Sequence, residues 1–337
     1  VYSGLTSVRE AIVQSLNTCA VRTNLMYGIY NSYKFMTEKL GFTTLTETDS
    51  AQVGNMALGG FENGVSTLEM AAAYSTFVND GIYTTPRTYS RVEDSQGNVI
   101  IDNNTESHVA MKKTTAYLMR SILQDVVTRG TGGGAYFSGM SIGGKTGTTD
   151  DARDRYFAGF TPYYCAAIWS GYKSNEVVYS GTNPCSAMFR RVMSRIHERL
   201  EDPGFHSCDG LVNVTVCADS GQLATEACAA DFRGSRVKTV QVAADTAPTK
   251  SCEMHKMVSY CKDGKHIATS SCPSSSVMQV AALDYARETV HDVTVPDDAY
   301  RVQVLSAGSC PVHGGTVTVD TPQQPKNESS LDDTEKP

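Results

Sequence analysis

Two short stretches of the sequence combine residue types that can act chemically on a peptide. The first is Lys145-Thr146-Gly147-Thr148, at the end of a glycine-rich segment typical of a strand. Such a strand can present an ammonium, two hydroxyls and a backbone N–H to one cleft, which suits an anionic substrate terminus and a developing oxyanion. Gly147 has no side chain to keep a substrate backbone from docking along the strand. Taken alone, the Lys-Thr-Gly tripeptide is equally consistent with an ordinary surface strand.

The second stretch is Ser15-Leu16-Asn17, near the end of a helix expected over residues 7–26. A serine hydroxyl and an asparagine amide two residues apart can share one site, where the hydroxyl relays protons and the amide binds a peptide group. An isolated Ser-x-Asn is also common at helix ends for structural reasons alone.

The elements that must position these residues can be predicted from capping boxes, turn residues and hydrophobic periodicity. Helices are expected over 7–26, 66–79, 112–128 and 186–201, a hairpin over 89–101, and strands over 139–148, 156–161 and 165–172. The three strands must be antiparallel, because parallel neighbours need a long crossover. The fold class is therefore α/β in the α+β sense, with an antiparallel sheet flanked by helices. Trp169 is expected in the core and His197 at the surface.

Several segments occur in the order found in class A penicillin-binding proteins, and the chain resembles that family over about residues 1–200. The segments that carry the resemblance are 8–18, 58–60, 64–74, 126–132, 144–149 and 156–162. The resemblance implies the penicillin-binding and serine β-lactamase-like transpeptidase fold. It also implies a peptidoglycan D,D-transpeptidase, which cross-links stem peptides ending in D-Ala-D-Ala and is a target of β-lactams.

The family uses three motifs, Ser-x-x-Lys, Ser-x-Asn and Lys-Thr-Gly, and the last two match this sequence. By this resemblance, Ser15 relays a proton to the leaving amine and Asn17 holds the donor peptide. Lys145 keeps the cleft positive and polarises Ser15. Thr146 and Thr148 bind the terminal carboxylate beside Gly147, and the Thr148 N–H supplies half of the oxyanion hole. No cofactor is expected for catalysis.

In family members the Ser-x-x-Lys motif lies upstream of Ser-x-Asn, where this chain has not yet begun. The nucleophile is therefore expected to be absent from the chain, and residues 1–337 alone should not acylate. The resemblance implies a longer parent protein with an N-terminal membrane anchor and a glycosyltransferase domain, at the extracytoplasmic face of a bacterial membrane. Other cell-wall synthesis proteins are further candidate partners.

Two other functions remain open at this level. One is a D,D-carboxypeptidase or β-lactamase-like hydrolase, which the contexts of residues 58–60 and 129–132 disfavour. The other is a non-catalytic module that binds cell-wall peptides. A formal net charge of −7 argues against a nucleic-acid surface. No run of 18 apolar residues occurs in the sequence, so no segment is expected to span a membrane.

Cysteine placement divides the chain, since seven of the ten cysteines lie between residues 208 and 310. Residues 217–228 align without gaps on 261–272, with a cysteine at each end, and each copy is followed by Cys-x-x-His. Two sets of three cysteines and one histidine result, which are Cys217, Cys228, Cys252 and His255 in the first and Cys261, Cys272, Cys310 and His313 in the second.

The cysteine–histidine sets fit either of two chemistries. An oxidising compartment favours disulfides such as Cys217–Cys228 and Cys261–Cys272. The repeated histidine favours structural zinc, because a disulfide has no use for it. Three regions are expected: a partial transpeptidase domain over 1–204, a Cys-rich extension over 205–320 and a disordered tail over 321–337.

Overall fold

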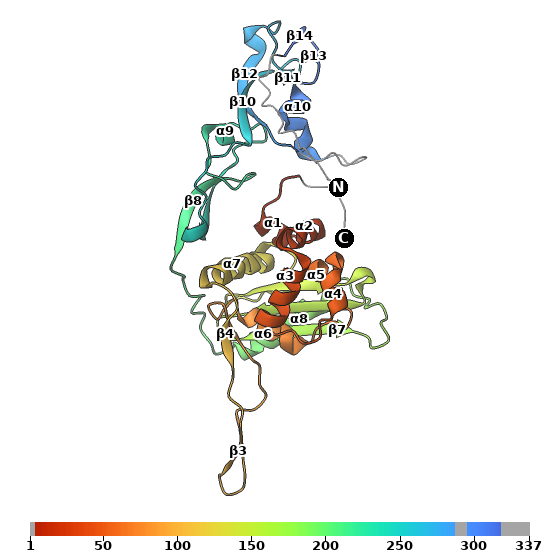
Figure 1. Ribbon diagram of the computed structural model, residues 1–337, viewed down its shortest axis with the longest axis vertical. Helices are drawn as coiled ribbons and strands as arrows, with labels where there is room; N and C mark the ends of the chain where they lie inside the picture. The colour runs from red at the N-terminus through yellow and green to blue at the C-terminus, as the bar shows by residue number, and fades with distance from the viewer. Residues whose placement is uncertain (1–3, 287–294, 318–337) are drawn as a thin grey trace, which may run out of the picture. The chain divides into compact units, whose positions relative to one another are not determined.

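The computed structural model describes residues 4–286 and 295–317, and they form two compact units (Figure 1). One unit contains residues 6–214 and 240–247. The other contains, among the described residues, 4–5, 215–239, 248–286 and 295–317. The expected tail at 321–337 lies outside the described residues. Within the described part of the chain, no helix is long and apolar enough to cross a lipid bilayer.

A three-stranded antiparallel sheet is the framework of the larger unit, as predicted. Its strands are β5 (Gly143–Thr148), β6 (Asp154–Phe160) and β7 (Cys165–Gly171), in the order β5-β6-β7. Lys145 lies opposite Ala158, and Gly147 lies opposite Tyr156. Because β5 pairs with β6 alone among the described strands, one backbone edge of β5 is left for another partner.

Helices cover both faces of this sheet, which confirms the predicted fold class. On one face, Phe157 packs against Phe189 of α8 (Pro184–Ile196). On the other face, Phe160 packs against Val13 of α1 (Val8–Val13) and Val126 of α7 (Lys113–Arg129). All five side chains are essentially inaccessible to solvent. Burying each phenylalanine contributes about 1.5–3 kcal/mol, so these contacts fix the helices that carry the site.

The helix predicted over residues 7–26 is wrong as a single element. The structure has two helices, α1 and α2 (Asn17–Tyr27), separated by Ser15 in the left-handed region with φ of 57°. The Leu16 N–H bonds to the Ala11 carbonyl and the Ser15 N–H to the Ile12 carbonyl, which is the hydrogen-bond pattern of a Schellman cap. Glycine usually occupies that position, so the serine gave no sequence signal for a helix end.

The other predicted elements of the larger unit are present, although the helix predicted over 66–79 ends at Ser75 and the strand predicted over 139–148 begins at Gly143. Ser66 and Glu69 cap α6 (Thr67–Ser75) through a reciprocal capping box. The hairpin expected over 89–101 forms between β2 (Arg91–Glu93) and β3 (Val99–Asp102). The remaining elements of this unit were not predicted individually. They are α3 (Ile29–Lys34), a π-helix (Phe35–Lys39), α4 (Glu47–Ala51), α5 (Val53–Leu58), β1 (Ile82–Thr84), β4 (Ser107–Val109) and the short 3-10 helices Gly133–Ala135, Asp150–Ala152 and Ala244–Thr246.

Two side chains, one directly after α8 and one on β7, reverse their predicted placement. His197 is only 6% exposed, because it follows α8 directly and lies 2.9 Å from the Thr161 hydroxyl. Trp169 is 43% exposed on β7, where its indole N–H donates to Asp154. The helix expected to extend to residue 201 ends at Ile196.

Short strands and single helical turns make up the smaller unit. β8 (Leu211–Cys217) and β9 (Val237–Ala243) form a ribbon that contributes residues to both units. β10 (His255–Cys261) lies between β11 (His266–Ile267) and β12 (Val277–Leu283). The unit is completed by α9 (Glu226–Ala229), α10 (Val302–Leu305), β13 (Ser309–Cys310) and β14 (Gly314–Thr316).

Candidate active site

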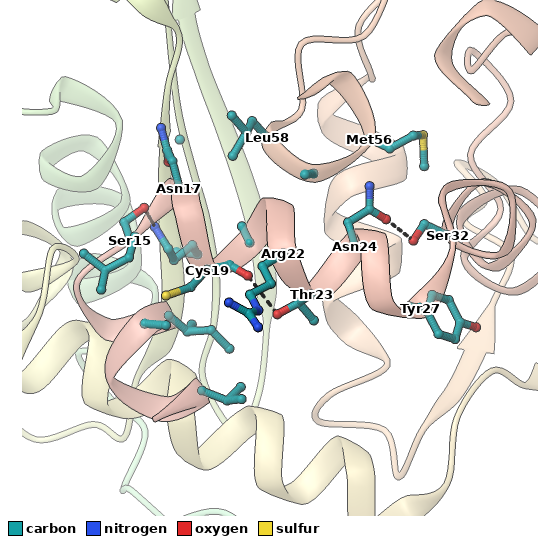
Figure 2. Close-up of a pocket in the computed structure, with 18 of the residues that line it drawn as sticks. Ser15, Asn17, Cys19, Arg22, Thr23, Asn24, Tyr27, Ser32, Met56 and Leu58 are labelled. Atoms are coloured by element: carbon teal, nitrogen blue, oxygen red, sulfur yellow. Dashed lines mark hydrogen bonds between the residues drawn. The ribbon is translucent and has the colours of Figure 1, made fainter. Parts of the chain in front are cut away.

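Ser15 and Lys145, 130 residues apart in sequence, meet at the centre of the candidate site. The Lys145 ammonium donates a hydrogen bond of 2.8 Å to the Ser15 hydroxyl and a second, of 3.0 Å, to the Thr146 carbonyl. Figure 2 shows the Ser15 hydroxyl in this hydrogen bond, with Asn17 close by at the start of α2. The left-handed backbone at Ser15 costs roughly 1–3 kcal/mol for a residue other than glycine. It turns the chain between α1 and α2, so that Ser15 and Asn17 face the same strand.

The segment after α7 links Ser15 to the strand. Gly130 passes so close to α1 that a β-carbon there would lie 2.5 Å from the Val13 carbonyl oxygen. The Thr131 N–H donates to that same carbonyl, and the Thr131 hydroxyl accepts a hydrogen bond of 3.2 Å from Thr146. Thr131 was not among the predicted site residues, although it lies in one of the segments that carry the family resemblance.

Ion pairs attach α1 to α7 on the outer side of the same junction. Arg129 contacts Glu10 at 2.8 Å and Asp125 at 3.1 Å. Arg9 also contacts Asp125, at 2.8 Å. Each pair is partly exposed and worth roughly 0.2–1 kcal/mol, so the network orients α1 more than it stabilises the fold. These charged residues are a second positioning group that the sequence analysis did not identify.

All six predicted site residues line one cleft of about 800 Å³. They are Ser15, Asn17, Lys145, Thr146, Gly147 and Thr148. Cys19, Leu58 and Tyr74 are among the residues that form the rest of its wall. A volume of this size is within the range of small-molecule sites, about 300–1,000 Å³. The cleft combines an apolar lining with a few polar groups, which is the arrangement that orients a bound ligand.

Burial lowers the pKa of Lys145 to about 8, because the half-buried ammonium loses hydration. A cation of this kind has a strong tendency to attract an anion. The cleft can therefore bind a carboxylate between Lys145 and the hydroxyls of Thr146 and Thr148.

The Ser-x-x-Lys spacing does occur in the chain, and the expectation that it is missing altogether needs correction. It is found at residues 170–173, 235–238 and 259–262. None of the three serines lines the cleft. Ser170 lies near the end of β7, the strand farthest from β5 in the sheet order, and residues three apart on a strand face opposite sides. These stretches share only the spacing of the family motif.

The two predicted cysteine–histidine sets each come together in the smaller unit. Within each set, the ligand-type atoms all lie within 4.8 Å of one another. All ten cysteines of the chain fall within the described residues, and each is a free thiol. The grouping could hold a metal ion, whereas the disulfides Cys217–Cys228 and Cys261–Cys272 are not formed.

Comparison with known proteins places both units in one family. The family described as penicillin binding protein transpeptidase domain matches residues 1–173. The family described as penicillin-binding protein 1A, C-terminal domain, matches residues 207–257. Penicillin-binding protein 1A from Clostridium novyi is 31% identical over 89% of this chain and 34% of its own length. The chain thus spans about a third of the length of the curated relatives it matches.

Two solved structures share the fold at lower identity. Penicillin-binding protein 1A from Haemophilus influenzae aligns with a TM-score of 0.57 and 19% identity, over 73% of this chain and 41% of that one. The PonA1 protein from Mycobacterium tuberculosis, solved in complex with penicillin V, aligns with a TM-score of 0.51 and 21% identity, over 59% and 58%. The chain belongs to the penicillin-binding protein 1A family, and it carries that family's transpeptidase domain and C-terminal domain.

Proposed function

We propose that the cleft is the acyl-transfer site of a peptidoglycan D,D-transpeptidase whose donor is a stem peptide ending in D-Ala-D-Ala. The observation that carries the proposal is the hydrogen bond between Lys145 and Ser15, within a cleft that all six motif residues line. The hydrogen bond joins two motifs that are distant in sequence.

In this proposal the donor peptide lies along the free edge of β5, where the Thr148 N–H can point at the reacting carbonyl. The terminal carboxylate binds the hydroxyls of Thr146 and Thr148 beside the positive charge of Lys145. The Asn17 amide holds the peptide from the opposite side of the cleft. Each of these groups binds or orients the donor before any bond is broken.

The proposed reaction has two steps. A serine hydroxyl gives its proton to the lysine of its own Ser-x-x-Lys motif and attacks the carbonyl of the penultimate D-Ala. The C–N bond breaks, and the terminal D-Ala leaves as an amine that takes a proton through Ser15. An amine from a second stem peptide then attacks the resulting ester, a new amide bond forms as the ester C–O bond breaks, and the amine's proton returns to the serine oxygen. Because Lys145 donates to the Ser15 hydroxyl, the oxygen of Ser15 is less basic and its proton is more readily given to the leaving amine.

None of the Ser-x-x-Lys stretches of this chain lines the cleft, and we therefore propose that residues 1–337 bind the donor without being acylated. The full-length gene product would provide the nucleophile from a Ser-x-x-Lys motif. It would act at the extracytoplasmic face of the bacterial membrane. It would also bind β-lactams, as the PonA1 protein binds penicillin V in its solved complex.

A product assay tests this function against the hydrolase. The full-length gene product is incubated with a stem pentapeptide as donor and a D-amino acid as amine acceptor, and the products are separated by mass. A transpeptidase yields the donor joined to the acceptor together with free D-Ala. Release of D-Ala with only the hydrolysed tetrapeptide would support a D,D-carboxypeptidase instead, and no turnover at all would support a non-catalytic binding module.

A further inference from the structure

The cysteine clusters of the smaller unit have the geometry of closed metal sites. In the first cluster, His255 Nδ1 lies 3.4 Å from both the Cys217 and Cys252 sulfurs. Zinc with tetrahedral bonds of about 2.3 Å to sulfur and 2.0–2.1 Å to nitrogen places such atoms about 3.6 Å apart. We propose that this cluster and its repeat each bind one structural Zn²⁺, the first through Cys217, Cys228, Cys252 and His255 and the second through Cys261, Cys272, Cys310 and His313.

The second cluster repeats the contacts of the first. His313 Nδ1 lies 3.4 Å from the Cys261 sulfur and 3.6 Å from the Cys310 sulfur. In both clusters it is therefore the same ring nitrogen that faces the sulfurs. The two sets span residues 217–255 and 261–313, and both fold into the same ligand arrangement. A chance grouping of cysteines would not produce this repetition.

Backbone and hydroxyl donors around the sulfurs are also repeated. The Thr225 N–H lies 3.4 Å from the Cys228 sulfur, and the Thr269 N–H lies 3.4 Å from the Cys272 sulfur. The Asp219 and Gly264 N–H groups donate at 3.4 Å to the first cysteine of each set. Hydrogen bonds of this kind stabilise thiolates, the form of cysteine that binds a metal.

Carboxylates hold the outer nitrogen of the first histidine. His255 Nε2 lies 2.9 Å from Asp231 and 3.3 Å from Asp219, so its proton belongs on Nε2 and Nδ1 is free to bind metal. Arg233 pairs with both aspartates, and Arg236 pairs with Asp219. Arg233 also pairs with Asp297, so the two arginines are shared among carboxylates, which leaves the charge of the three thiolates for the metal to offset.

A disulfide explanation accounts for less of the structure. An S–S bond of about 2.05 Å joins two sulfurs, so each set would keep one thiol and one histidine without a role. A β-carbon at Gly264 would lie 2.4 Å from the Cys310 sulfur and 3.7 Å from the Cys261 sulfur. The chain therefore approaches the second cluster as closely as a glycine permits, which suits a loop wrapped around an ion.

The proposed zinc is structural, because four protein ligands leave no open coordination position. Among the described residues, the segments that carry the ligands pack in small apolar clusters, such as Ile267, Ala282, Val302 and Leu305. A core of this size stabilises a unit poorly, and small units commonly rely on metals or disulfides for that reason. The inference does not depend on the transpeptidase proposal.

Zinc content and intact mass test the proposal directly on the wild-type chain. The chain is purified without added chelator, and zinc is measured by inductively coupled plasma mass spectrometry alongside native and denatured intact masses. We expect two zinc ions per chain, and a denatured mass in which all ten cysteines carry their hydrogens. Absence of zinc with a mass lower by two hydrogens per disulfide would overturn the proposal, as would a metal-free chain that stays folded with all its thiols reduced.

Single substitutions assign the two sites. Cys228→Ser should reduce the zinc content from two ions to one, and Cys272→Ser should do the same at the other site. Cys208→Ser is the matched control, because Cys208 lies in neither set, and it should keep both ions. If a variant does not fold, Co²⁺ replacement in the wild-type chain gives a second measurement, since tetrahedral cobalt bound by three thiolates and an imidazole has characteristic visible absorption. A cobalt spectrum without thiolate bands would count against the sites.

Discussion

Lys145 donates a hydrogen bond of 2.8 Å to Ser15, which joins the edge strand β5 to the turn between α1 and α2. The contact depends on the left-handed backbone at Ser15 and on the segment after α7 that binds α1.

Removing the charge of Lys145 should weaken anion binding. Lys145→Met keeps most of the side-chain length and loses the ammonium, so affinity for a noncovalent donor mimic ending in D-Ala-D-Ala should fall about 10- to 150-fold, the effect of losing a hydrogen bond to a charged group of about 1.5–3 kcal/mol. Isothermal titration calorimetry on the 337-residue chain measures this change. Lys173→Met removes an exposed lysine after β7 and should leave the affinity unchanged. Equal effects of the two substitutions would show that Lys145 acts only through overall charge.

The same interaction should depend on pH. The pKa of Lys145 is lowered to about 8 by burial, so the side chain is protonated below that pH and increasingly neutral above it. Affinity for the carboxylate-bearing ligand should therefore decline as the pH rises above about 8, toward the level of Lys145→Met. In Lys145→Arg the charge persists at high pH, and its binding curve should be flat through the same interval. A wild-type affinity that does not change up to about pH 10, the usual range of a lysine pKa, would contradict the assignment.

The contact between Gly130 and α1 should tolerate no side chain. Gly130→Ala places a β-carbon 2.5 Å from the Val13 carbonyl oxygen, so α1 must shift, at a cost of about 1–3 kcal/mol in the free energy of unfolding. Urea denaturation measures this loss. In Gly181→Ala the added carbon meets no atom within 4 Å, and stability should stay close to that of the wild type. A stable Gly130→Ala variant with unchanged ligand affinity would show that this close approach is not needed.

Arg129 should orient α1 more than it stabilises the fold. Arg129→Met removes the contacts to Glu10 and Asp125, and we expect a loss of stability below about 1 kcal/mol with a larger fall in ligand affinity. Thermal unfolding and calorimetry on the same samples separate the two effects. Lys34→Met removes the exposed ion pair between Lys34 and Glu38, which lies outside α1 and α7. It should change neither stability nor ligand affinity. A stability loss with no change in affinity would indicate a purely structural role.

The two metal sites should differ in how readily they release zinc. His255 is fully buried and its partners Asp219 and Asp231 are nearly so, whereas His313 is 19% exposed and Asp263 is 50% exposed. Chelator should therefore remove zinc from the second site first, in a two-phase release followed with a colorimetric zinc indicator. Asp231→Asn should speed release from the first site about 10- to 100-fold, the usual effect of losing a group that orients a ligand. Asp263→Asn, 3.9 Å from His313, should have a smaller effect. A single phase that neither substitution changes would contradict this order.

The sequence predicted the sheet and its flanking helices well, because their periodicity and capping residues are local signals. The capping box of Ser66 and Glu69 is one example, since both of its hydrogen bonds are present. The break at Ser15 escaped prediction, because a left-handed serine has no local signature. The burial of His197 depends on Thr161, a partner 36 residues away, and the exposure of Trp169 depends on its position on the last strand of the sheet.

The composition of the candidate site was predictable from the motifs, and its geometry was not. Spacing alone could not place Lys145 against Ser15, because their contact is made by tertiary packing over 130 residues. Thr131 and Arg129 were missed for the same reason. In the smaller unit, the repeat predicted both cysteine–histidine sets, whereas the orientation of His255 toward Asp231 emerged only from the fold.

Covalent labelling by a fluorescent penicillin is the most direct test of the acyl-transfer site. The full-length gene product is compared with its Lys145→Met and Lys173→Met variants, and the 337-residue chain is treated in parallel. Rapid labelling of the wild type and of Lys173→Met, a loss of at least about 10-fold in the rate for Lys145→Met, and an unlabelled shorter chain are the predicted results. A full-length protein that stays unlabelled, or a Lys145→Met variant labelled at the wild-type rate, would contradict the account.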